Sequence, residues 1–256
     1  MANVLYISKN LDRQPNTLRR AKLTNKFLRL PYFLWSATNN GNIDQIYFQA
    51  SSSGSNSTIR ITPNGIGKTF GDGSFIGYSW DGRSNVALPR WTMAAHFTAA
   101  SASTYQVILS TTLGNNGLMM RLDSTGTALE MVKPGIELVN SLATTVGESY
   151  FTIMSHDEGS DAYYILLKNV RTGAITSVSG TTTSASAGGD AVIVLGNITF
   201  SGTGGRSFNG TINSAYLGLD YTPINIAYDW LNNSWGHFNY DPDILAITVG
   251  STNYDL

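Results

Sequence analysis

From residue 91 onward, short runs of β-branched and aromatic residues alternate with turn-forming residues at intervals of roughly eight to twelve positions. Apolar and polar side chains alternate within most runs, as in a strand with one buried face. Gly, Asn, Ser and Asp between the runs supply the backbone conformations that hairpins need. The expected strands span residues 91–97, 105–110, 117–122, 128–132, 150–155, 163–169, 191–195 and 211–219. This spacing predicts an all-β antiparallel sandwich or barrel.

The composition argues against a helical fold. Charged residues make up only 13% of the 256 positions, and there are only four glutamates. Helices usually expose Glu, Lys and Arg, whereas this chain must cover its surface with Ser, Thr, Asn and Gly. We therefore expect a β-rich protein with many turns.

One segment past residue 90 has the pattern of a helix. Thr222 is the expected N-cap and Pro223 the first helical residue. Apolar residues follow with helical spacing at Ile224, Ala227, Tyr228 and Leu231. Trp230 and Trp235 are expected to hold this helix and the following tail against a sheet. Residues 179–190, by contrast, contain no large apolar residue and predict a mobile loop.

The first ninety residues are less regular. Residues 18–35 fit either an amphipathic helix or an extended arm, and Pro31 favours an ending or an extension. Residues 43–50 and 57–62 predict strands, and a Gly-rich region follows at 65–82. We expect a basic N-terminal arm over residues 1–35 and one sandwich domain over residues 36–256.

The net charge of −1 gives no overall electrostatic reason to bind nucleic acid or an anionic membrane. Zero cysteines exclude disulfides and thiolate metal sites. The N-terminal apolar stretch is short for a signal peptide, and no apolar run is long enough to span a bilayer. We expect a soluble protein made in the cytoplasm, with no membrane and no nucleic acid among its partners.

The positive charge is concentrated in the arm, where one acid accompanies seven basic residues. Three interpretations are a solvated charged face, a nucleic-acid contact and a docking arm on a protein lattice. Interleaved cations and apolar anchors favour docking on a protein. The expected assembly interface consists of Arg19, Arg20, Lys22, Lys26, Phe27, Arg29 and Tyr32.

Motifs in the C-terminal half resemble the laminin G-like, concanavalin A-like jelly-roll family. They are Trp91-Thr92-Met93, the YYILLKN run at 163–169, the VIVLG run at 192–196 and the FNGTI run at 208–212, followed by the helix. Val170 departs from the family's Y-x-N-G pattern. The segment 231–238 resembles the N-P-W-x-L-F ending of such domains in tailed bacteriophages, with Ser234 for Pro and His237 for Leu. The resemblance covers about residues 91–240 and implies a concanavalin A-like β-sandwich with one short C-terminal helix.

Glycosidases of this fold use a strand with closely spaced carboxylates, because retaining chemistry needs two carboxyl groups about 5–5.5 Å apart. No such strand occurs. The acidic run 157–161 contains Gly and Ser and predicts a solvated hairpin turn, with a weak Ca²⁺ site or a catalytic role as less favoured alternatives. His156 beside it is expected to be a turn residue, and His96 and His237 lie too far apart in the sequence to indicate a metal site. We expect no enzymatic activity, no catalytic residues, no metal and no cofactor.

One loop has the residues of a sugar site. Tyr78, Trp80, Asp81 and Arg83 combine flat aromatic rings with an acid and a guanidinium. A core or subunit-interface role for Trp80 is the favoured alternative to glycan binding.

These features predict a non-enzymatic phage virion structural protein, a head-decorating or cement protein docked through its arm. Its expected partners are other virion proteins, above all the major capsid protein, with a homo-oligomer and a surface glycan as further candidates. The alternative is a tail-associated module that binds a receptor or a polysaccharide. Long fibres usually carry coiled-coil or β-helical repeats, and the sequence has none.

Overall fold

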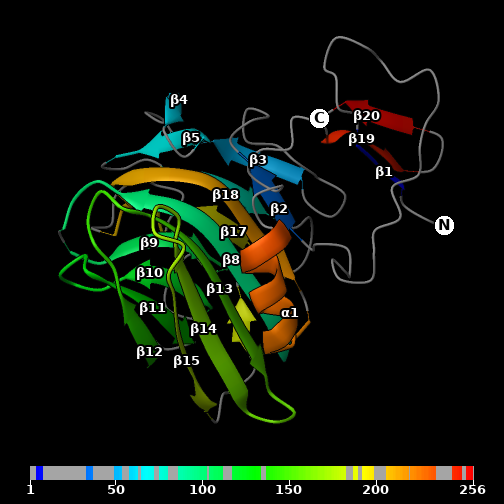
Figure 1. Ribbon diagram of the computed structural model, residues 1–256. Helices are drawn as coiled ribbons and strands as arrows, with labels where there is room; N and C mark the ends of the chain where they lie inside the picture. The colour runs from blue at the N-terminus through cyan, green and yellow to red at the C-terminus, as the bar shows by residue number, and fades with distance from the viewer. Residues whose placement is uncertain are drawn as a thin grey trace.

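The structure is a computed structural model of the 256-residue chain (Figure 1). It describes residues 4–7, 33–36, 49–53, 58–62, 65–71, 75–79, 86–102, 104–111, 117–133, 137–182, 187–189, 192–198, 206–218, 220–234, 244–249 and 252–255. The predicted antiparallel β-sandwich with one short helix is confirmed, and its two large sheets are consistent with a jelly roll.

The first sheet has eight strands. Its order is β15-β14-β13-β8-β18-β5-β4, and β2 also pairs with β18. The strands are β2 (Phe33–Ser36), β4 (Thr58–Thr62), β5 (Gly65–Phe70), β8 (Arg90–Ala99), β13 (Ser149–Asp157), β14 (Ala162–Asn169), β15 (Ile175–Thr181) and β18 (Gly210–Gly218). Strand β2 spans the boundary expected between the arm and the sandwich, and that division of the chain stays a prediction.

The second sheet has seven strands in the order β12-β11-β10-β9-β17-β6-β3. They are β3 (Gln49–Ser53), β6 (Ile76–Ser79), β9 (Gln106–Ser110), β10 (Met119–Leu122), β11 (Ala128–Lys133), β12 (Glu137–Ala143) and β17 (Val192–Leu195). The chain passes from one sheet to the other between β8 and β9 and again between β12 and β13. Such crossings between sheets are not apparent from the sequence spacing.

Two small sheets complete the described strands. Strand β19 (Ile244–Val249) pairs with β1 (Val4–Ile7) and β20 (Thr252–Asp255), and β7 (Val86–Leu88) pairs with β16 (Ala187–Gly189).

The main core lies between the two large sheets. On β8, Met93, Ala95 and Phe97 belong to this core, whereas Ala94 belongs to a separate cluster on the opposite face. The strand thus has two buried faces, one against the other sheet and one against the helix. This explains why nearly every residue of the strand is buried, including the polar residues Thr92 and His96.

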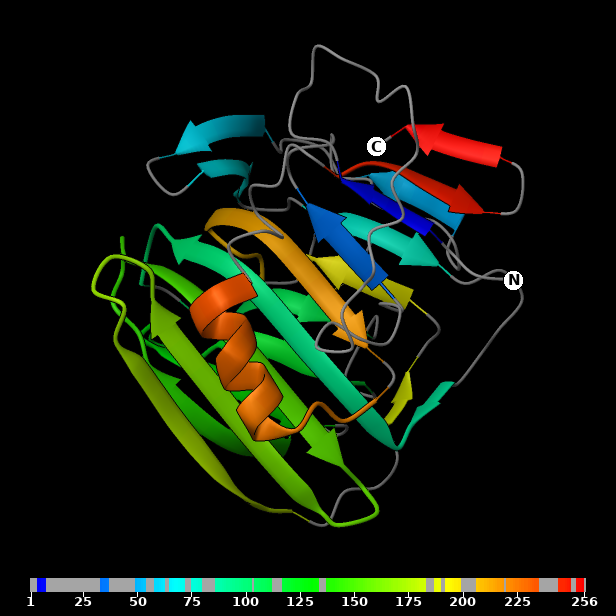
Figure 2. The ribbon, with the colours of Figure 1, turned by 45° about the vertical axis from the view of Figure 1, so that its right-hand side comes forward.

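Helix α1 (Ile224–Asp229) and the π-helical turn η2 (Trp230–Ser234) cover the outer face of the eight-stranded sheet (Figure 2). Trp230 and Leu231 pack there in the second buried cluster. The expected burial of Trp230 is confirmed, while Trp235 lies outside the described residues. No helix in the described part of the chain is long and apolar enough to cross a membrane.

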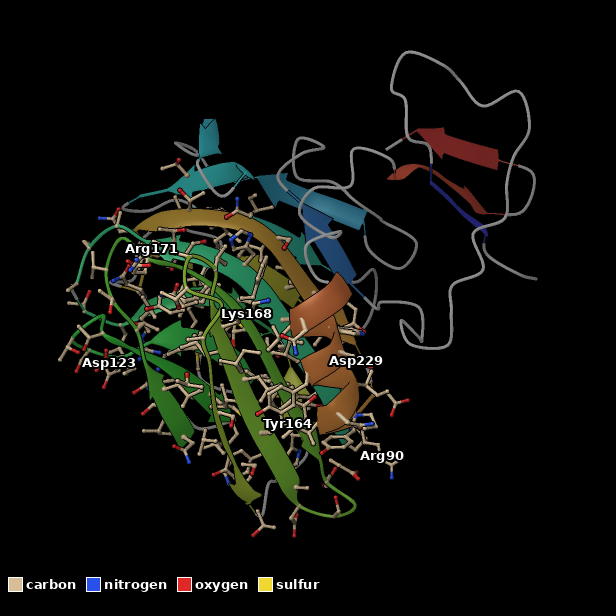
Figure 3. The ribbon with its side chains drawn as sticks, viewed as in Figure 1. Arg90, Asp123, Tyr164, Lys168, Arg171 and Asp229 are labelled. Carbon is tan, nitrogen blue, oxygen red and sulfur yellow. The ribbon has the colours of Figure 1, made fainter. Side chains whose placement is uncertain are left out.

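Polar contacts hold both ends of this helical segment. The Tyr164 hydroxyl donates to the Thr222 carbonyl over 2.6 Å, and Lys168 Nζ donates to the Leu231 carbonyl over 2.6 Å. Both side chains come from β14 and lie beside α1 (Figure 3). Burial raises the pKa of the Tyr164 phenol, so the hydroxyl stays a neutral donor.

The helix begins one residue later than predicted, with Pro223 as N-cap. Thr222 is held instead by the sheet: Thr92 Oγ1 lies 2.9 Å from Thr222 Oγ1, and the Thr222 backbone N–H donates to Thr92 Oγ1 over 3.1 Å. The first of these contacts uses the Thr222 hydroxyl, which is the group that would otherwise cap the helix.

The predicted loop over residues 179–190 is wrong in two places. Strand β15 continues to Thr181, and residues 187–189 form β16. Strand β15 pairs with β14 through backbone hydrogen bonds and exposes most of its side chains. An edge strand of this kind needs no large apolar residues.

Candidate functional site

Alternation on two neighbouring strands directs a pair of opposite charges away from the main core. Arg121 lies between two core residues of β10, and Glu130 lies between two core residues of β11. The flanking core residues are Met120, Leu122, Leu129 and Met131. Because successive side chains of a strand point to opposite faces, Arg121 and Glu130 share the outer face of the seven-stranded sheet.

The two charges form a nearly buried ion pair. Arg121 and Glu130 are direct cross-strand partners, and Arg121 Nε donates to Glu130 Oε2 over 2.6 Å. Only 4% of the Arg121 side chain and 9% of the Glu130 side chain are exposed. Removing one partner of an ion pair with so little access to water is costly, because the remaining charge stays buried and unpaired.

Tyr105 and Arg206 complete the group. The Arg121 guanidinium carbon lies 4.2 Å from the centre of the Tyr105 ring, and that of Arg206 lies 5.9 Å from it. Arg206 reaches this position because its carbonyl accepts the backbone N–H of Val107 on β9 over 2.9 Å. We call Tyr105, Arg121, Glu130 and Arg206 the outer-face cluster.

The outer-face cluster has an excess of positive charge, since two guanidinium groups face one carboxylate. Burial lowers the pKa of Arg206, and the nearby positive charge of Arg121 lowers it further. The Arg206 guanidinium stays protonated all the same, because the ordinary pKa of arginine is so high. The cluster therefore presents positive charge beside an aromatic ring.

The same face also carries exposed apolar surface. Among the described residues, the exposed large hydrophobic side chains are Tyr105 and Leu138, at 36% and 48% exposure. Leu138 pairs in register with Val132, which belongs to a small buried cluster separate from the main core. A partly exposed ring beside polar groups is a common element of ligand sites.

The acidic run at 157–161 is a hairpin turn between β13 and β14, as predicted. Burial alone would raise the pKa of Asp157, but hydrogen bonds from Arg90, Gly159 and Ser160 outweigh it, and the pKa is lowered. Asp157 is therefore a structural acceptor within the turn. In the part of the chain that the structure describes, no three His, Asp or Glu side chains gather where they would hold a metal ion.

Two of the three histidines are buried in the first sheet. His156 lies on β13 and stacks on Trp91 with ring centres 6.0 Å apart, so its expected place in the turn is wrong. Burial is the main cause of its lowered pKa. His96 lies within hydrogen-bonding distance of Ser149, 2.7 Å from its hydroxyl. His237 lies outside the described residues.

Most residues of the two predicted sites lie outside the described residues. This holds for Trp80, Asp81 and Arg83 of the sugar loop. Tyr78 lies on β6, where its backbone pairs with Ile193 of β17 and Ala50 of β3. The whole predicted assembly interface, Arg19, Arg20, Lys22, Lys26, Phe27, Arg29 and Tyr32, also lies outside, so both sites stay predictions.

Sequence reasoning missed the outer-face cluster, although one signal for it was present. Arg121 and Glu130 are the single charges of the expected strands 117–122 and 128–132, which a short turn connects. Opposite charges at such positions indicate a cross-strand pair. Arg206 carries no comparable signal, because its place beside β9 depends on the topology of the sandwich.

No model of a protein family matches the chain, and no curated protein matches it in sequence. Solved structures do match it in fold. One is the enzymatically active domain of tailspike protein 2 from bacteriophage CBA120, with a TM-score of 0.52 and 12% identity, over 78% of this chain and 33% of that one. Another is the binding domain of botulinum neurotoxin DC in complex with SialylT, with a TM-score of 0.55 and 11% identity, over 79% and 51% of the two chains.

A third is an arabinofuranosidase complexed with arabinofuranosyl-α-1,2-xylobiose, with a TM-score of 0.52 and 12% identity, over 75% and 44% of the two chains. The chain thus spans about a third to a half of the length of these proteins. At such identities the likeness shows a shared sandwich fold and nothing beyond it.

The comparisons contradict the expectation that the protein is not an enzyme. That expectation rested on a missing carboxylate motif within one strand. An enzymatically active tailspike domain and an arabinofuranosidase share the fold. A sandwich brings together side chains from strands far apart in the sequence, so the absence of one local motif does not exclude activity.

Proposed function

We propose that the protein is a glycan-binding module of a bacteriophage tail. Support comes from the fold, which is shared with tailspike domains and with proteins solved in complex with carbohydrates. We also propose that the sandwich is of the concanavalin A-like type that the sequence motifs indicate. The matching structures are sandwich domains of this general kind.

The observation that carries the proposal is the place of Tyr105. Its partly exposed ring lies beside two guanidinium groups, and one of these is paired with a carboxylate. Sugars bind where an aromatic ring covers the apolar face of the pyranose and charged or amide groups take up its hydroxyls. The outer-face cluster supplies both kinds of contact.

The tail location replaces the head-decorating role expected from the sequence. Support for the tail comes from the matching tailspike structures. The proposal keeps the basic residues of the arm, 1–35, as the segment that docks the module onto other virion proteins, and keeps residues 36–256 as its sandwich. The protein then acts in the virion.

Replacing Tyr105 with alanine is expected to weaken binding to a bacterial surface polysaccharide by about tenfold, equivalent to about 1.4 kcal/mol. The ring contributes stacking area, and its loss leaves the strands intact. Affinity electrophoresis through gels that contain purified capsular polysaccharides or lipopolysaccharide O-chains measures the change. Leu138→Ala, on the same face, is the matched control and should migrate as the parent does. Equal retardation of parent and Tyr105→Ala in every gel would contradict the role of the ring.

The copy number of the protein per virion distinguishes a tail location from a head location. A tail module is present in few copies set by the symmetry of the tail, whereas a decorating protein approaches the number of capsid subunits. We expect quantitative densitometry of purified virions to give a small fraction of the major capsid protein. A ratio near one copy per capsid subunit would restore the head-decorating interpretation.

A further inference from the structure

The outer-face cluster contains hydrogen-bond donors that the fold leaves unused. Arg121 Nη1 and Arg206 Nη1 are both buried, and neither has a hydrogen-bond partner among the residues that the structure describes. Arg121 uses its Nε for Glu130. Buried donors are normally paired, and an unpaired donor on a charged group is especially costly.

The charges explain what would satisfy these donors. The cluster holds two cations and one carboxylate. An added anion would reduce the repulsion between the guanidinium groups. It would also accept hydrogen bonds from their unpaired N–H groups. The planar fork of arginine fits a carboxylate especially well, because two parallel N–H bonds reach its two oxygens. A neutral sugar would leave the charge excess in place.

The Tyr105 ring is a further feature of the outer-face cluster, besides the unpaired donors and the excess positive charge. Tyr105 lies against Arg121 and is more than a third exposed, so one side of it is held by a cation and part of its surface faces outward. A ligand that places a flat apolar face on the ring and an anionic group toward the guanidinium groups uses all of these features. Acidic pyranoses have both parts within one residue.

We propose that Arg121 and Arg206 bind the carboxylate of an acidic sugar, a uronic or sialic acid, whose ring lies against Tyr105. This inference rests on the proposed function and adds the class of glycan. Glu130 is a positioning residue, because its ion pair fixes the Arg121 guanidinium. Other anions, such as sulfate, carry negative charge but have no pyranose ring to lie against Tyr105.

The test is an NMR titration of the full chain with methyl glycosides of glucuronic, galacturonic and mannuronic acid and of N-acetylneuraminic acid. Each acid is compared with its neutral counterpart, and inorganic sulfate is a separate arm. We expect at least one acid to shift the Tyr105 ring signals saturably and to bind about tenfold more tightly than its neutral partner.

Arg206→Gln is the diagnostic variant, because Arg206 is less buried than Arg121 and pairs with no carboxylate in the described part of the chain. It should weaken binding of the acid about tenfold while binding of the neutral sugar stays unchanged. The matched control is Arg171→Gln, which removes an exposed arginine from the turn between β14 and β15, where it pairs with Glu148 just before β13. It should leave both affinities as they are.

The outcomes separate the two proposals. Equal affinity for acid and neutral sugar, or an unchanged affinity in Arg206→Gln, overturns the acidic-sugar site and leaves the proposed function standing. Sulfate binding as tight as the best sugar acid overturns the sugar part of the site. Absence of binding by every sugar, together with absence of polysaccharide retardation, overturns the proposed function itself.

Discussion

Replacing Trp230 with alanine is expected to lower the free energy of unfolding by roughly 3–5 kcal/mol. The side chain is 2% exposed and meets Tyr216 edge to face, with ring centres 5.4 Å apart. Truncation would leave a cavity between η2 and the outer face of the eight-stranded sheet. No disulfide holds this layer in place, since the chain has no cysteine.

Urea unfolding followed by tryptophan fluorescence and by circular dichroism measures the loss. Asn232→Ala is the matched control, because Asn232 lies in the same π-helical turn and is exposed. We expect the control to change stability by less than about 0.5 kcal/mol. A loss below about 1 kcal/mol in Trp230→Ala would mean that the helical segment contributes little to the stability of the sandwich.

Replacing Arg121 with methionine is expected to cost about 3–5 kcal/mol, because Glu130 would remain buried without its partner. Replacing both residues, as Arg121→Met with Glu130→Leu, should restore most of that stability. Apolar side chains of similar volume suit a site that is almost dry. The single variant thus measures the stability lost when the Glu130 charge is buried without a partner. The double variant measures the stability of the ion pair relative to apolar side chains.

A double-mutant cycle in urea provides the numbers. The exposed pair Arg171–Glu148 is the control, and Arg171→Met should cost at most about 1 kcal/mol. A double variant less stable than either single variant would show that the buried pair is itself stabilising. The ion pair would then serve mainly to stabilise the fold, and its part in ligand binding would need separate support.

The central strands could be predicted from the sequence because burial leaves a pattern there. Strands β8, β13 and β18 are flanked on both sides by other strands and covered on both faces, so nearly all their residues are apolar or small. The edge strand β15 could not be predicted. It has one paired neighbour, and its exposed Ser, Thr and Gly residues have the composition of a loop.

The outer-face cluster shows the same limit for function. The alternation in β10 and β11 was sufficient to place Arg121 and Glu130 on one face. Tyr105 and Arg206 lie far apart in the sequence, and backbone contacts beside β9, such as the bond from the Val107 N–H to the Arg206 carbonyl, bring them together. A sequence search for local motifs favours short continuous segments such as residues 78–83 and overlooks a site that the sheet assembles.

The most direct test of the account is a crystal structure of the protein with an oligosaccharide that contains the best-binding sugar acid. The account predicts one sugar ring against Tyr105, with its carboxylate about 2.7–2.9 Å from Nη1 of Arg121 and of Arg206. A sugar bound on another face of the sandwich, with the outer-face cluster unchanged, would contradict it.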